Sequence, residues 1–452
     1  MPAANSDNGA DAHLTLDRLR ALVGSGRIDT VLLAVPDLQG RLKGKRYNAR
    51  HFCERVAHQG AEMCAYVLAT DVDMRPLDGF TLASWETGYQ DIVVTPAIST
   101  LRLVPWMPGT ALVLGDVADR HGEPIEVAPR QMLRRQLTHL AAHGLHVKTG
   151  LETEFVLYQG TGDQNMTPLT AENLDFALDH TPVALPFFRR LEAGLAGAGL
   201  PVEAVKTEGA GGQVEVTFPY GEPLAACDGH LVFKHAARTL ATRMGLTPTF
   251  MAAPQTGIGS GLHLHLSLWK NNTSVLTDPD GALSTLAEHA VAGLLDALPQ
   301  LGPLYAPNIN SYKRYVPSSF APTAFTWGYD NRTCAIRVVG HGENLHLEVR
   351  VPGADANPYL ATAAVVAAIA YGLDRTPPLP SEQSGNAYRD MTAPPLAHTL
   401  EEALTWFSES TIAEARFGRE VVQHYTRLAQ VELDHQRALV PDTERARWLL
   451  HA

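Results

Sequence analysis

The sequence has little cysteine, no long apolar run and no secretion signal. Its four cysteines, at positions 53, 64, 227 and 334, have neither metal-ligand nor paired spacing, which predicts reduced thiols in a cytoplasmic protein. The longest apolar run, residues 361–373, is too short to span a bilayer and predicts a buried helix. The N-terminus opens Met-Pro-Ala-Ala-Asn-Ser without a basic region and an apolar stretch, so we expect no signal peptide.

Positive charge is also scarce. Lys and Arg number 36 against 48 Asp and Glu, giving a net charge of -12. Apart from residues 41–46 there is no basic patch, so neither nucleic acid nor an anionic membrane is expected as a partner. The length of 452 residues permits more than one hydrophobic core, and we expect two domains.

The chain divides into a leader and two domains. Residues 1–13, rich in Asn, Asp, Gly and Ala, predict a disordered leader. Residues 14–107 predict a small sheet with a helix or two, ended by the Pro/Gly cluster at 105–109. Residues 108–452 alternate strands and helices. The expected elements are strands at 30–35, 41–45, 91–95, 100–104 and 248–252, helices at 14–23, 129–143, 187–198 and 228–244, and a mostly helical segment from 357 on.

The most informative stretch is residues 262–268. His263, His265 and Ser267 alternate with four leucines, so a strand here presents imidazoles on one face and apolar core on the other. Three further stretches alternate in the same way. Their polar members are Glu152 and Glu154, then Gln213 and Glu215, then His346, Glu348 and Arg350.

These polar faces could belong to ordinary amphipathic strands that face solvent. Solvated faces, however, usually use Lys, Thr, Ser and Gln, whereas these use mainly Glu, His and Arg. Such side chains suit hard divalent cations and anionic substrates. We therefore expect the four strands to line one cavity.

The predicted cavity concentrates like charges. Carboxylates a few ångströms apart cannot all ionise without counter-charge, and divalent metals are the simplest source of it. The expected ligands would form two sites with room for water and phosphate oxygens. They are Glu152, Glu154, Glu208, Glu215, His263 and Glu348.

Four arginines come from nearby stretches, at positions 314, 332, 337 and 350. Guanidinium forks bind carboxylate and phosphate bidentately, so metals with arginines suggest phosphoryl transfer to an anionic acceptor. For any single arginine, a structural ion pair is an equally open interpretation.

Several motifs together resemble glutamine synthetase, in order and spacing over nearly the whole chain. They are Gly-Leu-Glu-Thr-Glu-Phe at 150–155, Glu-Gly-Ala-Gly-Gly-Gln-Val-Glu at 208–215, Gly-Ser-Gly-Leu-His-Leu-His at 259–265, Asn-Ser-Tyr-Lys-Arg at 310–314, Asn-Arg at 331–332, Glu-Val-Arg-Val-Pro at 348–352 and Asn-Pro-Tyr-Leu at 357–360. Residues 37–46 and 84–88 also resemble the N-terminal domain of that family.

The resemblance implies an α+β fold, with a small β-grasp N-terminal domain and a large catalytic domain of the glutamine synthetase and guanido-kinase type. It also implies a dodecamer of two stacked hexameric rings, in which each active site lies between neighbouring subunits. The implied substrates are glutamate, ATP and a nitrogen nucleophile. The implied reaction passes through γ-glutamyl phosphate and ends in an amide.

Roles of single residues are also implied by the resemblance. Two to three Mg²⁺ or Mn²⁺ ions would bind per site, one held by Glu154, Glu208 and Glu215 and another by Glu152, His263 and Glu348. Arg314 and Arg350 would bind the glutamate carboxylate, with the backbone of Gly259 near the amino group. His265, Ser267, Arg332 and Arg337 would face the ATP phosphates, and Arg332 and Asp78 would take part in catalysis.

Departures from the family pattern concern the ammonium side. The loop after Arg314 carries Phe320 where glutamine synthetases have a glutamate, and the usual Asn before Gly259 is Ile258. Phenylalanine provides no charge but suits the carbon chain of an amine. The sequence thus resembles glutamine synthetase-like γ-glutamyl:amine ligases, with a small primary amine such as ethanolamine as the expected substrate.

Three alternatives remain open. Glu86 and Asp91 could serve a polyamine such as putrescine from a neighbouring subunit. The chain could also be an ammonia-using glutamine synthetase, or a homologue without catalysis that has a structural or regulatory role. All six metal-ligand positions are present, which argues against the last. Tyr388 lies where some relatives are modified, but its flanks differ, so no modification is predicted.

Overall fold

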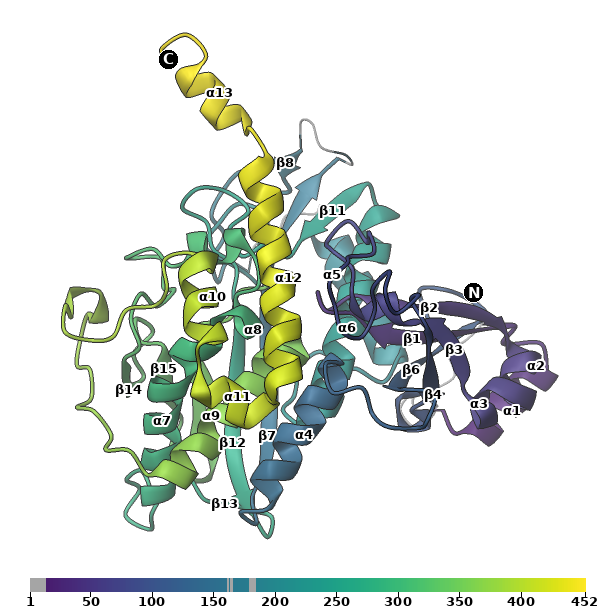
Figure 1. Cartoon of the computed structure of the whole chain (residues 1–452), viewed down its shortest axis with the longest axis horizontal. Coiled ribbons are helices and arrows are strands. Elements are labelled where there is room, and N and C mark those ends of the chain that lie inside the picture. The colour runs from purple at the N-terminus through teal and green to yellow at the C-terminus, as the bar shows by residue number, and fades with distance from the viewer. Residues whose placement is uncertain (1–13, 161, 163–165, 179–183) are drawn as a thin grey trace.

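The computed structural model describes residues 14–160, 162, 166–178 and 184–452, and the predicted disordered leader at 1–13 lies outside them. A small N-terminal domain built on one sheet lies beside a larger domain, in which helices cover a second sheet (Figure 1). This is the α+β arrangement that the resemblance implied.

The N-terminal sheet has the strand order β2-β1-β6-β4-β3, with β5 paired to β6. Its strands are β1 (Thr30–Pro36), β2 (Leu42–Asn48), β3 (Ala61–Cys64), β4 (Asp91–Pro96), β5 (Arg102–Leu103) and β6 (Thr110–Ala118). The β1–β2 hairpin closes on Asp37, whose Oδ1 accepts from the backbone N of Gln39 at 3.0 Å and of Arg41 at 2.8 Å. Helix α1 (Leu16–Gly24), capped by Thr15, buries Leu19 and Leu22 in this domain. Shorter helical segments connect the strands: α2 (Ala49–His51), η1 (Phe52–Val56), α3 (Ala57–Gln59), η2 (Ala65–Leu68) and η3 (Ile98–Thr100).

The predicted domain boundary at residue 107 is wrong. Strand β6 follows it, yet it pairs in parallel with β1 in the middle of the N-terminal sheet. The Pro/Gly cluster at 105–109 is a turn between β5 and β6, closed by a hydrogen bond from Thr110 N to Met107 O at 3.1 Å. Gly109, with a φ of +75°, provides the left-handed residue of that turn. The first domain therefore extends at least to residue 118.

The larger sheet has the strand order β14-β15-β16-β12-β7-β10-β9, with β11 and β8 paired to β7 and β13 to β12. Its strands are β7 (His146–Gln159), β8 (Thr167–Pro168), β9 (Ala204–Thr207), β10 (Gln213–Thr217), β11 (Leu246–Thr249), β12 (Leu262–Lys270), β13 (Thr273–Ser274), β14 (Trp327–Tyr329), β15 (Ile336–Val339) and β16 (His346–Val349). The leucines of β12 are all buried, as the alternation predicted.

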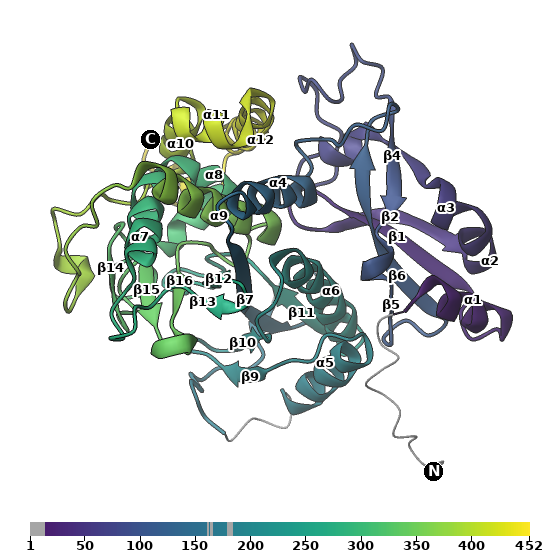
Figure 2. The same ribbon diagram turned by 90° about the horizontal axis from the view of Figure 1, so that it is seen from below.

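Helices pack on the apolar face of this sheet (Figure 2). They are α4 (Pro129–Ala141), α5 (Leu185–Gly197), α6 (Pro223–Thr242), α7 (Thr285–Ala297) and α9 (Pro358–Arg375). The predicted helices at 129–143 and 187–198 match α4 and α5 closely, whereas α6 begins before the predicted residue 228, because Pro223 starts it. The expected core helix at 361–373 is the buried part of α9, which crosses α7 so closely that a Cβ on Gly372 would lie 2.1 Å from the carbonyl O of His289.

The last part of the chain is helical, as expected, and joins the two domains. It contains α10 (Leu400–Ser408), α11 (Thr411–Phe417), α12 (Arg419–Ala438) and α13 (Asp442–Trp448); the short segments η4 (Leu298–Leu301), α8 (Gly302–Tyr305), η5 (Ile309–Arg314), η6 (Gly342–Asn344) and η7 (Ala387–Arg389) lie earlier in the domain. From α12, Arg427 Nε donates to the carbonyl O of Asp78 at 3.2 Å, and His424 Nε2 lies 2.9 Å from the carbonyl O of Leu68. Within the described residues, no helix is long and apolar enough to cross a membrane.

Candidate active site

The register of the larger sheet brings the acidic strands together. β7 lies between β10 and β12, so Glu154 is the cross-strand partner of Glu215, and Glu152 is the partner of His263. On the other side of β12, Glu348 is paired with His265. Directly paired residues have their Cβ atoms about 4.5–5.5 Å apart, so three neighbouring pairs place all these polar side chains on one face.

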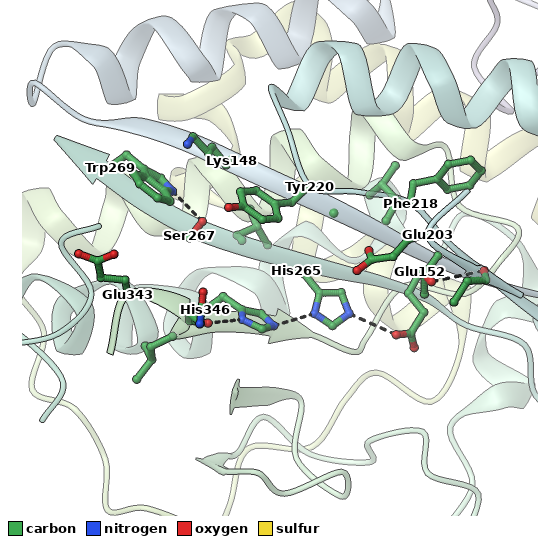
Figure 3. Close-up of a pocket in the computed structure, with 17 residues that line it drawn as sticks. Lys148, Glu152, Glu203, Phe218, Tyr220, His265, Ser267, Trp269, Glu343 and His346 are labelled. Atoms are coloured by element: carbon green, nitrogen blue, oxygen red, sulfur yellow. Dashed lines mark hydrogen bonds and ion pairs between the residues drawn. The ribbon is translucent and has the colours of Figure 1, made fainter. Parts of the chain in front are cut away.

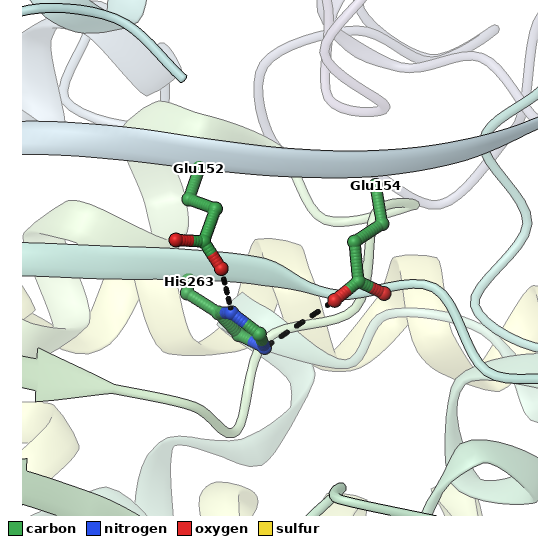
Figure 4. Close-up of side chains that lie close together, drawn as sticks. All are labelled: Glu152, Glu154 and His263. Atoms are coloured by element: carbon green, nitrogen blue, oxygen red, sulfur yellow. Dashed lines mark hydrogen bonds and ion pairs between the residues drawn. The ribbon is translucent and has the colours of Figure 1, made fainter. Parts of the chain in front are cut away.

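Among the described residues, three groups of side chains have ligand atoms within 4.8 Å of one another. Glu154, Glu208 and Glu215 form one group, which is the predicted first metal set. The second predicted set, Glu152, His263 and Glu348, does not form one group. Glu152 instead belongs to two groups, one with Glu154 and His263 (Figure 4) and one with His265 and Glu348. His265, expected to face nucleotide phosphate, therefore also belongs to the carboxylate cluster.

Glu152 is held by both histidines of β12. Its Oε1 lies 2.6 Å from His263 Nδ1, and its Oε2 lies 3.4 Å from His265 Nε2. Burial on its own raises the pKa of Glu152, but the hydrogen bonds from His263 and His265 outweigh burial and lower it. The pKa of His265 is raised, since the bond to Glu152 and the nearby Glu348 charge outweigh the effect of its burial. This carboxylate is therefore charged and already oriented.

Glu348 lies between two arginines and is almost fully buried. Arg337 Nη1 donates to its Oε2 at 2.8 Å, and Arg350 Nη1 pairs with its Oε1. Burial raises the pKa of Glu348, but the Arg350 charge, with those of His263 and His265, lowers it to about 2. Two residues predicted to contact substrate or ATP thus hold a predicted metal ligand.

Arg314 lies buried at the end of η5, against β12. Its Nη1 donates to the carbonyl O of Arg350 at 3.0 Å, and its Nη2 lies 3.3 Å from His263 Nε2. A Cβ on Gly261 would lie 2.6 Å from His263 Nε2 and 2.7 Å from that Nη2, so glycine permits this close approach. Gly259 lies alongside, where its carbonyl O accepts from Gln213 Nε2 at 2.8 Å.

A buried carboxylate that the sequence did not single out anchors η5. Asp355 Oδ2 accepts from Asn308 Nδ2 at 2.9 Å and from Ser311 Oγ at 2.6 Å, which are both close to Arg314 in the chain. Burial raises the pKa of Asp355. Asp355 therefore positions the segment that carries Arg314.

The Glu154, Glu208 and Glu215 group contains a lysine that the sequence analysis did not assign. Lys206, the register partner of Glu215, pairs with Glu208 and lies 3.7 Å from Glu215 Oε2. Burial and the Glu152 charge raise the pKa of Glu215 to about 9. In the sequence, Lys206 lies two residues before Glu208, and this alternation was the available signal that both share one face. A lysine on an edge strand ordinarily faces solvent, however.

Beside the acidic groups lies a cavity of about 400 Å³, within the usual range for small-molecule sites (Figure 3). His265 and Ser267, the two residues predicted to face the ATP phosphates from strand β12, line it. Its walls include Lys148, whose Nζ lies 3.6 Å from the centre of the Trp269 ring, and Tyr220. Of the described residues, neither Arg332 nor Arg337 lines this cavity.

Two histidines connect the cavity to the acidic groups. His346 Nε2 lies 3.1 Å from His265 Nδ1, and His265 Nε2 faces Glu152 (Figure 3). His346 was noted in the sequence as part of a polar face but was given no role. The contact fixes the orientation of His265.

Phe320, the residue predicted at the amine side, lies in a loop next to Arg350. Phe320 is 63% exposed with a φ of 59°, and its carbonyl O accepts from Arg350 Nη2 at 3.3 Å. Among the described residues it is not one that lines the cavity.

Asp78 belongs to the N-terminal domain, where its Oδ1 accepts from Trp85 N at 3.2 Å. The hydroxyl of Tyr388 donates to the carbonyl O of Ala321 at 3.1 Å, which fixes the Phe320 loop from the other side.

The donor set fits divalent cations. Carboxylate oxygens with one or two imidazoles, spaced within 4.8 Å, suit Mg²⁺ or Mn²⁺. Burial and the nearby Glu152 charge raise the pKa of Glu215 to about 9, and a bound cation would offset the repulsion between these carboxylates. Carboxylates next to a cavity lined by aromatic rings and a lysine suit the binding of a nucleoside triphosphate with metal.

Comparisons with known proteins agree with this geometry. Residues 126–448 match the catalytic domain of glutamine synthetase. The chain is 46% identical to the γ-glutamylethanolamide synthetase GlnA4 of Streptomyces coelicolor, over 96% of this chain and 95% of that protein. It is 33% identical to a glutamate–isopropylamine ligase of a Pseudomonas species, over 96% and 97%. The solved ADP complex of GmaS is similar, with a TM-score of 0.82, 26% identity and coverage of 95% of this chain and 99% of that one. The chain therefore belongs to the glutamine synthetase family.

Proposed function

We propose that this glutamate–amine ligase uses ATP to join the γ-carboxylate of glutamate to ethanolamine. The observation that carries the proposal is the loop at Phe320, where an apolar side chain is exposed next to Arg350. The full-length similarity to a γ-glutamylethanolamide synthetase supports the choice of amine.

The side chains divide the work by chemical type. Arg314 and Arg350 would bind the carboxylate of glutamate, beside the backbone of Gly259. His265 and Ser267 would contact ATP in the cavity, where Trp269 and Tyr220 offer ring faces to the base. Arg332 and Arg337 would reach the phosphates from the β14–β15 side of the sheet.

Two to three divalent ions would bind in the acidic groups. Glu154, Glu208 and Glu215 would hold one, while Glu152, His263 and Glu348 would hold another. When bound, the ions neutralise the charge between the glutamate carboxylate and the triphosphate.

The reaction would have two steps. The glutamate γ-carboxylate attacks the γ-phosphorus of ATP, which forms γ-glutamyl phosphate and releases ADP. The amine nitrogen then attacks the acyl carbon, phosphate leaves, and the amine loses a proton. Arg332 would stabilise the charge on the transferred phosphoryl group.

The amine is expected to enter at Phe320. A glutamate at this position would attract ammonium, whereas the phenyl ring provides an apolar wall for the two carbons of ethanolamine. This interpretation places the amine outside the nucleotide cavity, consistent with the exposure of Phe320.

The family's dodecamer is part of the proposal. Trp85, in the segment anchored by Asp78, is 76% exposed, as expected if it packs on the neighbouring subunit's active site. Helix α13 projects from the body of the subunit (Figure 1), and Leu450 just beyond it is 88% exposed. A second ring would cover the apolar groups of helix α13 and Leu450. Light scattering of the full chain and of a chain truncated after residue 440 tests this, because the truncation should separate the rings.

An amine panel tests the substrate. Phosphate release and the mass of the glutamyl product are measured with ethanolamine, methylamine, isopropylamine, putrescine and ammonium at matched concentrations. We expect the highest kcat/KM with ethanolamine. A higher value with putrescine or with ammonium would overturn the choice of amine but not the ligase chemistry.

The role of Phe320 has its own test. Phe320→Glu should shift the ratio of ammonium to ethanolamine kcat/KM by roughly tenfold, an effect of about 1.4 kcal/mol, because a carboxylate attracts ammonium. Phe320→Leu is the matched control and should keep the preference for ethanolamine. An unchanged ratio in Phe320→Glu would remove this residue from the amine site.

A further inference from the structure

The Glu154, Glu208 and Glu215 group already contains a cation. Lys206 extends from the edge strand β9 on the same face as its register partner Glu215. Its ammonium Nζ pairs with Glu208 Oε1 and lies 3.7 Å from Glu215 Oε2. The Lys206, Glu208 and Glu215 side chains are 23%, 18% and 12% exposed, so water screens these charges only in part.

The lysine and a divalent ion would compete for the same oxygens. Mg²⁺ binds carboxylate oxygen at about 2.0–2.1 Å, so an ion held by Glu208 and Glu215 would lie within a few ångströms of Nζ where it is now. Two positive charges at that separation repel each other strongly in a half-buried site. The ion can enter only if the ammonium group moves away from the carboxylates.

A second acceptor for the ammonium group lies beside the first. Lys206 Nζ is 3.4 Å from Asp175 Oδ1 and 4.2 Å from the centre of the Phe176 ring. A carboxylate and an aromatic face are both suitable partners for an ammonium group. Asp175 is outside the described groups of metal-type ligands, so it remains available when these are occupied.

This acceptor is fixed to the strand that carries Lys206. Phe176 N donates to the carbonyl O of Thr207 at 3.3 Å, and Thr207 Oγ1 donates to the carbonyl O of Leu174 at 2.6 Å. Residues 174–176 therefore stay next to Lys206 whether its ammonium group binds Glu208 and Glu215 or Asp175 and Phe176.

We propose that Lys206 is a resident counter-cation of the Glu154, Glu208 and Glu215 group, that a divalent ion displaces it onto Asp175 and Phe176, and that it thereby sets the metal affinity of this group. The proposal rests on the metal assignment made under the proposed function. It explains how the carboxylates of this group are compensated in part without metal. Lys206 acts here as a positioning residue, because it does not itself touch substrate.

The test is Mn²⁺ binding to the full-length protein, measured by the electron paramagnetic resonance signal of free Mn²⁺ without substrates. Lys206→Met keeps the aliphatic stem and removes the charge, so it should tighten one class of Mn²⁺ site by roughly tenfold, since about 1.4 kcal/mol corresponds to that factor. Lys206→Arg retains the charge and should remain near the parent affinity. Lys270→Met, an exposed lysine at the end of β12, should change nothing.

A double-mutant cycle tests the role of Asp175. Asp175→Asn should weaken Mn²⁺ binding a few-fold while Lys206 is present, because the displaced ammonium group loses its acceptor. The same change in the Lys206→Met background should have no effect, which distinguishes this role from direct attraction of the metal. Equal weakening in both backgrounds would overturn the Asp175 part of the proposal.

The variant Glu215→Gln distinguishes a failure of the metal assignment from a failure of the proposal for Lys206. If it leaves Mn²⁺ binding unchanged, the metal assignment itself fails. If it removes a site, but Lys206→Met leaves the affinity unchanged or weakens it, only the proposal for Lys206 fails. Lys206→Gln serves as a second neutral variant should Lys206→Met unfold, which a thermal melt of each variant monitors.

Discussion

The two halves of the acidic site compensate their charge in different ways. On the β12 and β16 side, Glu348 is 1% exposed and lies between Arg337 and Arg350, whose side chains are 10% and 6% exposed. On the β9 and β10 side, Glu215 and Glu208 share one lysine that has a second acceptor within reach. The first half uses fixed guanidinium groups, and the second uses a single flexible ammonium group.

The difference affects both protonation and metal binding. Burial raises the pKa of Glu348, but the charges of Arg350, His263 and His265 lower it to about 2, whereas burial and the Glu152 charge raise that of Glu215 to about 9. The arginine half is therefore organised and ionised before any ligand binds. The lysine half keeps a deficit of positive charge, which an ion can correct.

The largest expected effect is on stability, from the arginine half. Glu348→Ala leaves Arg350 buried without its carboxylate partner and Arg337 paired with Asp330 alone, so the free energy of unfolding should fall by about 3–5 kcal/mol. Glu208→Ala, in the more exposed lysine half, should cost less than about 1 kcal/mol. Urea unfolding of both variants without metal measures the contrast, and equal losses would show that the two halves do not differ.

The next effect is on catalysis and concerns Glu154, which lies between the two halves of the acidic site. Glu154→Gln keeps an oxygen that accepts from Gly261 N, now at 2.8 Å, but removes the charge that belongs to two of the groups. We expect kcat to fall by roughly 10²- to 10³-fold, the usual loss when one preorganised electrostatic group is removed. The free energy of unfolding should change little. Steady-state kinetics at saturating Mg²⁺ measure the loss, and a kcat close to that of the parent would exclude Glu154 as a ligand.

A smaller effect should come from the buried support of Arg314. Asp355→Ala removes the acceptor of Asn308 and Ser311, so the KM for glutamate should rise by about tenfold, in line with the loss of one or two hydrogen bonds. Ser311→Ala removes one of these bonds and should give a smaller rise. The KM for ATP is the internal control and should be unchanged in both variants. A rise shared equally by glutamate and ATP would indicate general loosening of the fold.

Stability should also depend on pH. The pKa of Glu215 is raised from 4.5 in the unfolded chain to about 9, so its contribution is fully present below pH 4.5 and is lost as pH rises toward 9. Glu348, lowered to about 2, contributes above pH 4.5 and loses that contribution as pH falls toward 2. Thermal melts of the metal-free protein should therefore show a decline toward high pH that Glu215→Gln flattens. If thermal stability still declines toward high pH in Glu215→Gln, the decline comes from the titration of another group.

Much of the site was readable in the sequence because its residues lie on strands with strict alternation. The period of two placed Glu152, Glu154, His263 and Glu348 on one face, and the motifs placed the chain in its family. Strand register was not readable, yet it decides which acid faces which base. This is why His265 joined the carboxylates rather than facing only the cavity.

The errors in the fold have local causes. The Pro/Gly cluster at 105–109 has the composition of a linker, but it forms a hairpin turn, because β6 finds its partner in β1, which is remote in sequence. The same limitation hid Asp355, whose partners at the start of η5, Ser311 and Asn308, are 44 and 47 residues away. Composition and periodicity report on neighbours along the chain and give no information on such contacts.

The sequence by itself determined the residue types at the site, the faces they occupy on their strands and the family to which the chain belongs, because these depend on local periodicity and on motif order. Only the tertiary structure decided how charge is shared among them. Pairing of β9 with β10 brought Lys206 to Glu215, and pairing of β15 with β16 brought Arg337 to Glu348. The energy of a charge depends on burial and on neighbours within a few ångströms, and both are properties of the folded chain.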